Sequence, residues 1–410
     1  MSDSGLKKNL SYNTIGMVLY NFAIWVLSAI IMRKLGAAYS GMYAVAMSLG
    51  NTLYASALWG MRSFIVSDVN SVYTEQEYLS ARTAAVILSV LVLVPVIGLS
   101  NYSSEQSGIL AAYTLFKCSE ALIELTECFN QKNFHMEINA QGMIIRSALY
   151  IIGFYGILSF SRSLTAAFAL LTLLSFAVFL FFSLRKVRQI SPFPVKIILN
   201  RKVLDILKSC FPIMVFELLA SLIIAVPRLF FEQIGSLSAL GIYNSVYTFV
   251  IFLQLVINVL IYTLAPYMAK AYHEHRGKDF RKYLLIVAGG AVGLGAAAEI
   301  MSVLLGRFVI GLVYGPEAQP YYTYLYMGIV SGVTLAFTWI ASQIFVIMSR
   351  QNVQMYCSLI STAACFILSK LLVNASDCNR MSLVLILTNL IYILSAGVFG
   401  LLISRNKADI

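Results

Sequence analysis

Apolar stretches of about 20 residues recur along the 410-residue chain, and short polar segments separate them. A helix rises about 1.5 Å per residue, so each stretch can cross the roughly 30 Å hydrocarbon core of a bilayer. The pattern predicts about twelve transmembrane helices, at 11–32, 41–61, 83–100, 109–129, 141–160, 164–184, 209–231, 239–265, 283–305, 321–348, 354–373 and 381–403. We therefore expect an all-α integral membrane protein with no separate globular domain.

Composition and charge agree with this class. Hydrophobic residues make up 60% of the chain and charged residues 11%, whereas a soluble domain has about 25% charged residues. The net charge is +11, and the lysines and arginines gather in alternate connecting segments, above all 185–208 and 270–282. This bias is typical of cytoplasmic loops. It predicts a multi-pass protein of the inner (cytoplasmic) membrane with both termini in the cytoplasm, and it argues against a nucleic-acid partner. Only the Arg33–Lys34 pair, on the predicted outer side, is discordant.

A short motif occurs twice, in corresponding places of the two halves. Gly-Met-Tyr at 41–43 and Gly-Ile-Tyr at 241–243 each follow a glycine-containing turn and open a predicted helix. The basic, proline-containing segment 185–208 separates the halves. The repeat predicts an N-terminal six-helix lobe (1–184), a cytoplasmic linker (185–208) and a C-terminal six-helix lobe (209–410) around a central cavity. Repeated lobes of this kind are common in transporters, which hold their substrate between them.

Several predicted spans contain charged residues. On insertion scales a lipid-facing charge at a helix centre costs about 2.5–3.5 kcal/mol, so these side chains must face protein or water. In span 109–129, Lys117, Glu120, Glu124 and Glu127 are spaced by three and four residues and share one helix face. Two interpretations stay open: a salt-bridge ladder of Lys117 with Glu120 and Glu124, or the wall of a hydrated cavity.

The other charged and polar positions extend the cavity hypothesis. With Lys117, the cations inside spans are Arg146, Arg228 and Lys370. Glu217 and Glu299 are further carboxylates that could carry H⁺ or Na⁺ and couple transport to a gradient, or simply make polar contacts. Amide and hydroxyl side chains suited to sugar hydroxyls are Asn244, Tyr247, Gln254, Asn258 and Asn21. Such residues also hydrogen-bond between membrane helices, so either role is possible.

Three stretches carry a family resemblance. They read RKLGAAYSGMYAVAMSL (33–49), QKNFHMEINAQGMIIRS (131–147) and PRLFFEQIGSLSALGIYNSVYTF (227–249). They resemble the polysaccharide flippases of the Wzx type, in the multidrug/oligosaccharidyl-lipid/polysaccharide exporter (MOP) superfamily. In one respect the chain departs from this family, because relatives often have an acidic residue where Pro227 precedes Arg228.

The resemblance implies a function and partners. It implies a flippase, not an enzyme, that moves undecaprenyl-diphosphate-linked oligosaccharide from the cytoplasmic to the outer leaflet by alternating access, for surface polysaccharide such as O-antigen or capsule. The partners would be the lipid-linked oligosaccharide, membrane lipid, and a polysaccharide polymerase with other assembly proteins. The cations Lys117, Arg146, Arg228 and Lys370 would bind the diphosphate, with Glu120 and Glu124 balancing their charge.

Two other functions are conceivable. A cation-coupled multidrug exporter would favour an acidic site, but span 11–32 contains no Asp or Glu. An integral-membrane glycan polymerase or ligase would need a long external catalytic loop, and the longest predicted outer loop is only 306–320. The chain has no Walker A motif, which argues against ATP. Its six cysteines form no CxxC pair, so no metal or other cofactor is predicted beyond a coupling ion.

Overall fold

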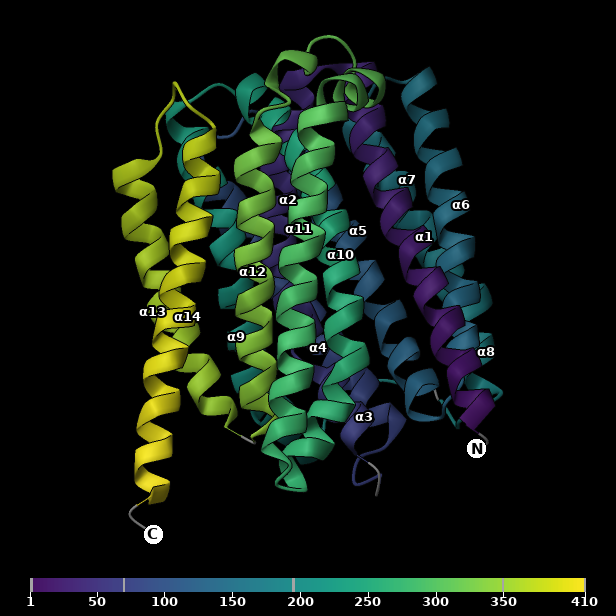
Figure 1. The fold of residues 1–410 in the computed structure, drawn as a ribbon. Coiled ribbons are helices and arrows are strands. Elements are labelled where there is room, and N and C mark those ends of the chain that lie inside the picture. The colour runs from purple at the N-terminus through teal and green to yellow at the C-terminus, as the bar shows by residue number, and fades with distance from the viewer. Residues whose placement is uncertain (1–2, 69–70, 194–195, 349, 409–410) are drawn as a thin grey trace. The chain divides into compact units, whose positions relative to one another are not determined.

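The computed structural model describes residues 3–68, 71–193, 196–348 and 350–408. Within these ranges the chain is helical throughout, apart from turns, short connections and one isolated bridge. Figure 1 follows the helices from the purple N-terminus to the yellow C-terminus. Among the described residues, ten helices are long and apolar enough to cross a membrane, and α2 and α5 are further long helices. Each of the twelve predicted spans falls on a different long helix, so the prediction of an all-α membrane protein is confirmed.

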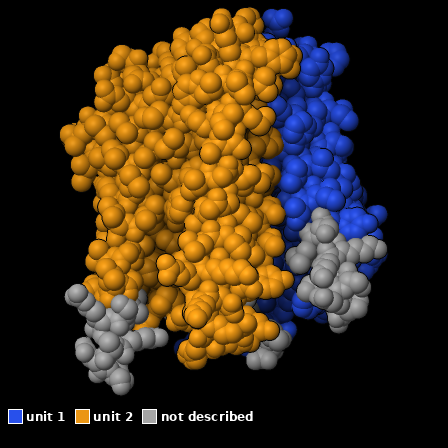
Figure 2. All heavy atoms as spheres, viewed as in Figure 1, with its two compact units in different colours: residues 1–35, 42–221 blue, residues 36–41, 222–410 orange. Residues whose placement is uncertain are grey.

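The chain forms two compact units, residues 1–35 with 42–221 and residues 36–41 with 222–410 (Figure 2). The first half contains α1 (Asp3–Leu35), α2 (Ala37–Leu58), α3 (Met61–Ser67), α4 (Glu75–Leu99), α5 (Ser104–Lys132), α6 (Met136–Phe160), α7 (Leu164–Val178), the π-helix η1 (Phe179–Ser183) and α8 (Leu184–Arg188). The second half contains α9 (Arg201–Ile234), α10 (Leu237–His273), α11 (Gly277–Tyr314), the 3₁₀ helix η2 (Gln319–Tyr321), α12 (Tyr324–Ile347), α13 (Gln351–Leu372) and α14 (Asn379–Ala408).

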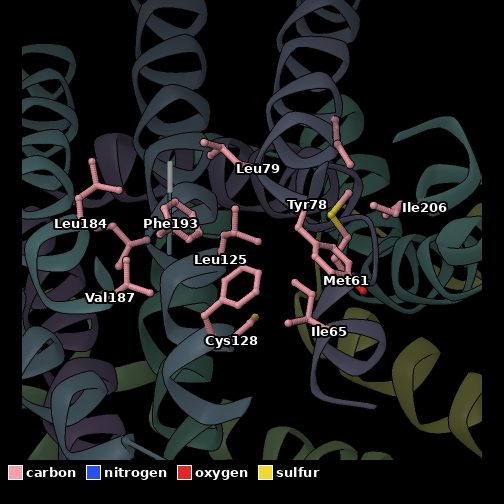
Figure 3. Packing of buried hydrophobic residues seen from close by; sticks show 14 of the residues in the cluster. Met61, Ile65, Tyr78, Leu79, Leu125, Cys128, Leu184, Val187, Phe193 and Ile206 are labelled. Atoms are coloured by element: carbon pink, nitrogen blue, oxygen red, sulfur yellow. The ribbon is translucent and has the colours of Figure 1, made fainter. Parts of the chain in front are cut away.

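The boundary between the units lies inside α9, not in the basic linker. A hydrophobic cluster explains why the start of α9 packs with the first unit. In Figure 3, Ile206 of α9 and Phe193 of the linker belong to the same cluster as Met61, Tyr78 and Leu125. The indole nitrogen of Trp59 also donates a hydrogen bond to the carbonyl oxygen of Leu207 (2.8 Å). The predicted division at 184 and 209 into two repeated lobes stays a prediction.

A left-handed break separates α2 from α3. Trp59 and Gly60 have φ angles of 52° and 61°, a conformation that glycine adopts without strain. A Cβ on Gly60 would lie 2.5 Å from the side chain of Ile213, so α9 passes close to the break. The break redirects the chain after α2, and this positions Arg62 at the start of α3.

The loop after α3 is held by one carboxylate and ends in a capping box. Asp68 accepts hydrogen bonds from the backbone amide of Val72 (2.9 Å) and the hydroxyl of Tyr78 (3.0 Å). Burial opposes ionisation of Asp68, but these hydrogen bonds outweigh it and lower its pKa. Thr74 and Glu77 then cap α4 reciprocally. This cap starts α4 eight residues before the predicted span at 83, which places Arg82 inside the helix.

The discordant cation at the predicted outer end of α1 has local partners. The ammonium of Lys34 donates a hydrogen bond to the hydroxyl of Ser159 (2.6 Å) and lies 3.9 Å from the ring centroid of Tyr155. Both partners belong to α6, which packs against α1. The exposed Lys34 side chain is thus held along α6 while its charged end stays at the helix end, as expected of an interfacial lysine.

Candidate functional site

The predicted charged stripe of α5 lies inside the first unit. Glu120, Glu124 and Glu127 are 3%, 9% and 7% exposed. Helices α3, α4, α6 and α7 all contact α5. An ionised carboxylate buried in this way is stable only when cations and hydrogen-bond donors surround it. The partners of the three carboxylates therefore decide what the stripe can do.

Glu120 has four donors from three helices. One carboxylate oxygen accepts from a guanidinium nitrogen of Arg146 (2.6 Å) and from the hydroxyl of Tyr20. The other accepts from the hydroxyls of Tyr150 (2.5 Å) and Ser175 (2.9 Å). Because α1, α6 and α7 all contribute, Glu120 ties the first unit together. Its hydrogen-bonding capacity is filled by the protein itself.

Glu124 and Glu127 are also matched by arginines. Glu124 is bonded by Arg62 (2.7 Å) and by Arg82 (2.8 Å), whose side chain is fully buried. Glu127 pairs with the second guanidinium nitrogen of Arg146 (2.5 Å) and more loosely with Arg62 (3.5 Å). The guanidinium fork suits this arrangement, since one arginine can serve two carboxylates.

Arg62 and Arg82 were not predicted as site residues, and the structure pairs Glu120 and Glu124 with arginines instead of Lys117. Span 41–61 ends before Arg62 and span 83–100 begins after Arg82, so the hydrophobic pattern leaves both in a cytoplasmic segment. Two features of the sequence could have drawn attention to them: the Thr74–Glu77 capping box, which starts a helix before Arg82, and the three glutamates, which need cations nearby. Among the ion pairs of the described residues, none joins Lys117 to Glu120 or Glu124. The expected ladder is therefore built from arginines.

The expected role of Arg146 also changes. Its side chain is 4% exposed, and both terminal nitrogens are engaged by carboxylates. Its guanidinium carbon lies 4.9 Å from the ring centroid of Tyr20. Arg146 is therefore enclosed by protein in this structure, and the sequence hypothesis that it holds the diphosphate does not match its surroundings.

Lys117 is the surplus cation of this cluster. The three glutamates of α5 form ion pairs with three arginines, and Glu217, a fourth carboxylate near these arginines, forms no ion pair among the described residues. The half-buried Lys117 has no ion pair within the described part of the chain, and its ammonium lies 4.4 Å from the ring centroid of Tyr54. A ring face attracts a cation but carries no net charge. Lys117 is therefore the cation of this stripe that has no carboxylate ion pair among the described residues.

The two candidate coupling carboxylates have different surroundings. Glu217 of α9 belongs to the first unit and interacts electrostatically with Glu124, Arg82 and Arg62. Glu299 of α11 belongs to the second unit and is half-buried. In both, one carboxylate oxygen is buried with no hydrogen-bond partner in the described structure. Only Glu217 is thus associated with the charge cluster, and a coupling role for either stays a prediction.

In the second unit, Arg228 is the buried cation. It is 5% exposed, its guanidinium carbon lies 5.3 Å from the ring centroid of Tyr247, and its Nε has no hydrogen-bond partner. No carboxylate pairs with it among the described residues. The Tyr247 hydroxyl lies 3.2 Å from that of Ser331, and the buried amide nitrogen of Asn244 is also unpartnered. Arg228 and Asn244 thus both have donor capacity to spare.

The remaining candidates are less distinctive. Lys370 is exposed near the end of α13, as expected of a lysine that extends to the membrane surface. Gln254 is buried and Asn258 half-buried on α10. The Asn21 amide donates to the carbonyl oxygen of Met17 in its own helix (2.8 Å). For these residues, a substrate role stays a prediction.

Comparisons with known proteins show which sequences and which folds this chain is similar to. No protein-family model matches the chain. It is 24% identical over 316 residues to the capsular polysaccharide biosynthesis protein CapF of Staphylococcus aureus, covering 76% of this chain and 78% of that protein. Among solved structures it is similar to an inward-facing multidrug resistance MATE family transporter of the MOP superfamily, with a TM-score of 0.70, 15% identity and coverage of 97% and 98%.

A second solved structure agrees. A mutant form of the Vibrio cholerae MATE transporter VcmN gives a TM-score of 0.65 at 15% identity, covering 99% of this chain and 97% of that one. The chain thus shares its fold with two solved membrane transporters. The fold expected from the sequence resemblance is thereby confirmed: the chain has the fold of the MATE transporters of the MOP superfamily and is similar in sequence to a capsular polysaccharide biosynthesis protein.

Proposed function

We propose that this transporter is a flippase for an undecaprenyl-diphosphate-linked oligosaccharide, which it moves from the cytoplasmic to the outer leaflet for surface polysaccharide synthesis. The proposal places it in the inner membrane with both termini in the cytoplasm, beside a polysaccharide polymerase and other assembly proteins. The similarity to CapF supports a polysaccharide role. The observation that carries the proposal is the cation Lys117 near the middle of the long helix α5, with no ion pair among the described residues.

The argument for an anionic substrate rests on charge balance. A buried charge is costly unless it is paired, and Lys117 has no carboxylate ion pair among the described residues, so an anionic substrate would stabilise it. A diphosphate carries about two negative charges and strong acceptor oxygens, which an ammonium binds as a point charge. Arg228 is a second cation without a carboxylate partner, in the other unit. In this proposal Lys117 contacts the diphosphate, while the arginines around Glu120, Glu124 and Glu127 hold the helices.

The alternative is a cation-coupled multidrug exporter, as the MATE-like fold allows. A cationic drug would be repelled by Lys117 and Arg228, whereas a diphosphate would be attracted. A strain that lacks the gene distinguishes the two functions. Our proposal expects lipid-linked oligosaccharide to accumulate on the cytoplasmic side and drug sensitivity to stay unchanged. Raised drug sensitivity without such accumulation would support the exporter instead.

Variants at Lys117 test the proposed role in that strain. Lys117→Ala should restore less than about a tenth of glycan export while the protein inserts normally, and Lys117→Arg should restore part of it. Lys270→Ala is the matched control, since that side chain is 67% exposed at a helix end, and it should export as the parent does. If Lys117→Ala exports normally, the diphosphate role is wrong.

A third variant separates this role from a structural one. If Lys117 were needed to neutralise Glu120 and Glu124, replacing both with Gln would rescue Lys117→Ala. Because arginines already pair with these glutamates, we expect no rescue. Recovery of both expression and export in the triple variant would show that the stripe is only a salt-bridge ladder.

A further inference from the structure

A short segment before α9 is bonded to the rest of the first unit. Residues 196–202 of the basic linker, which we call the arch, lead into the first turn of α9. The backbone amide of Ile198 donates a hydrogen bond to the hydroxyl of Ser80 (3.0 Å), and the side-chain amide of Asn200 donates to the carboxylate of Glu77 (3.0 Å). The side-chain oxygen of Asn200 also caps the start of α9. The arch therefore has a defined position within the first unit.

The apolar side chains in and next to the arch divide into an inner and an outer set. The inner set packs into the hydrophobic cluster of the first unit and consists of Ile198, Val203 and Ile206. The outer set is Ile197, Leu199 and Leu204, which are 59%, 92% and 56% exposed. Because hydrogen bonds hold the backbone of the arch, the outer side chains stay outside the cluster. They are available to a partner outside this chain.

The arch is also basic, and its charge is not neutralised locally. Lys196 and Arg201 are exposed and form no ion pair among the residues that the structure describes. The ammonium of Lys202 lies 3.9 Å from the carboxylate of Glu77, a loose contact. Free cations thus stand beside exposed apolar side chains.

The second basic segment, 270–282, neutralises part of its own charge. Arg276 pairs with Glu274 (2.6 Å) and with Asp279 (3.0 Å), and Lys270 lies 3.9 Å from Glu274. The side chains of Lys270 and Arg276 are 67% and 51% exposed. This pair of cations therefore resembles the pair in the arch in charge and exposure, but acidic neighbours balance it.

The arch lies close to the bilayer. The helix α9 is long and apolar enough to cross a membrane, and its predicted span begins at 209, eight residues after Arg201. Eight helical residues rise about 12 Å, and the headgroup layer on each side of the hydrocarbon core is about 5–8 Å thick. Long basic side chains can extend across the remaining distance. Cations beside apolar side chains at this depth are suited to an anionic lipid surface.

We propose that the arch binds anionic phospholipid at the membrane surface where α9 begins. Lys196 and Arg201 contact the headgroup phosphates, and Ile197 and Leu199 lie between the headgroups. The free positive charge favours an anionic lipid over a neutral one, and the exposed apolar side chains favour a lipid over free phosphate. This site does not depend on which substrate the protein transports.

Photocross-linking at the arch tests the proposal. The photoreactive amino acid benzoylphenylalanine replaces Leu199, and the protein is placed in nanodiscs of equal amounts of phosphatidylglycerol and phosphatidylcholine. An anionic surface favours each nearby lysine or arginine by about fivefold, so we expect at least fivefold more phosphatidylglycerol adducts than phosphatidylcholine adducts. The same amino acid in place of Ile300, which is 61% exposed on α11, should give a ratio near one.

Two charge variants complete the test. In the double variant Lys196→Gln with Arg201→Gln, the ratio at position 199 should fall below two. The matched control is Lys270→Gln with Arg276→Gln, which removes the same charge from paired side chains and should leave the ratio unchanged. All four positions are exposed, so each variant should keep the elution volume of the parent in size-exclusion chromatography.

Three results would overturn the proposal. The first is a ratio near one at position 199 without any charge variant, and the second is a ratio that Lys196→Gln with Arg201→Gln leaves unchanged. The third is the absence of lipid adducts at position 199. If cross-linking in intact cells then joins the arch to another protein, the outer set covers a protein contact and not a lipid surface.

Discussion

Replacing Arg146 tests whether the charge cluster of the first unit is structural. In Arg146→Leu, both Glu120 and Glu127 lose a buried ion pair. Removing one partner of a buried pair typically costs about 3–5 kcal/mol, so we expect a loss of unfolding free energy of at least that size. Glu120 keeps three hydroxyl donors, those of Tyr20, Tyr150 and Ser175. The penalty should therefore fall mainly on Glu127, whose other ion pair, with Arg62, spans 3.5 Å.

These contacts suggest a second variant that should restore stability and a third that serves as a control. Adding Glu127→Gln to Arg146→Leu removes the stranded charge and should recover about 1–3 kcal/mol, the usual penalty of an unsatisfied buried group. Lys117→Met removes a cation that has no ion pair in the described structure. It should cost no more than the cation–π contact with Tyr54, about 0.5–2 kcal/mol.

The free energies can be measured by reversible unfolding in mixed detergent micelles, with tryptophan fluorescence as the signal. The expected order of stability is parent, Lys117→Met, the double variant and then Arg146→Leu. If Lys117→Met destabilises the protein as much as Arg146→Leu does, Lys117 is part of the structural cluster and the assignment of a surplus cation is wrong.

Three further predictions concern local structure. Gly60→Ala should destabilise the first unit by about 1–3 kcal/mol in the same unfolding assay, because the left-handed φ and the contact with Ile213 both disfavour a Cβ; unchanged stability would contradict the break described between α2 and α3. The lowered pKa of Asp68 contributes stability above its unfolded value of about 3.9 and loses it as the pH falls through the folded value. Asp68→Asn should therefore be less stable than the parent at pH 7, with the difference shrinking below pH 4, and a constant difference would exclude this linkage. Cysteine labelling at positions 196 and 374 should report opposite sides of the membrane, and labelling from the same side would refute the twelve-span topology.

The sequence by itself determined the class of the protein and the place of its helices. Hydrophobic length alone decides whether a segment can span a bilayer, because the lipid core is uniform and thick enough to require about 20 apolar residues. Every predicted span accordingly lies on a long helix. The Gly-x-Tyr repeat also marked a real contact. The backbones of α2 and α10 approach each other at Gly41 and Gly241, where a larger side chain would clash.

Tertiary structure decided which charges are paired. The spacing along α5 showed that Lys117 and the glutamates share a face, but helical spacing cannot reveal which side chains neighbouring helices bring to that face. The capping box before α4 and the left-handed break after α2 brought in Arg82 and Arg62, which pair with Glu124. Arg146 pairs with Glu120, so both carboxylates that the sequence offered to Lys117 are bonded to arginines. In a low-dielectric interior each carboxylate pairs with the cation that the packed backbone places within reach, so the free cation of the site could be identified only from the folded protein.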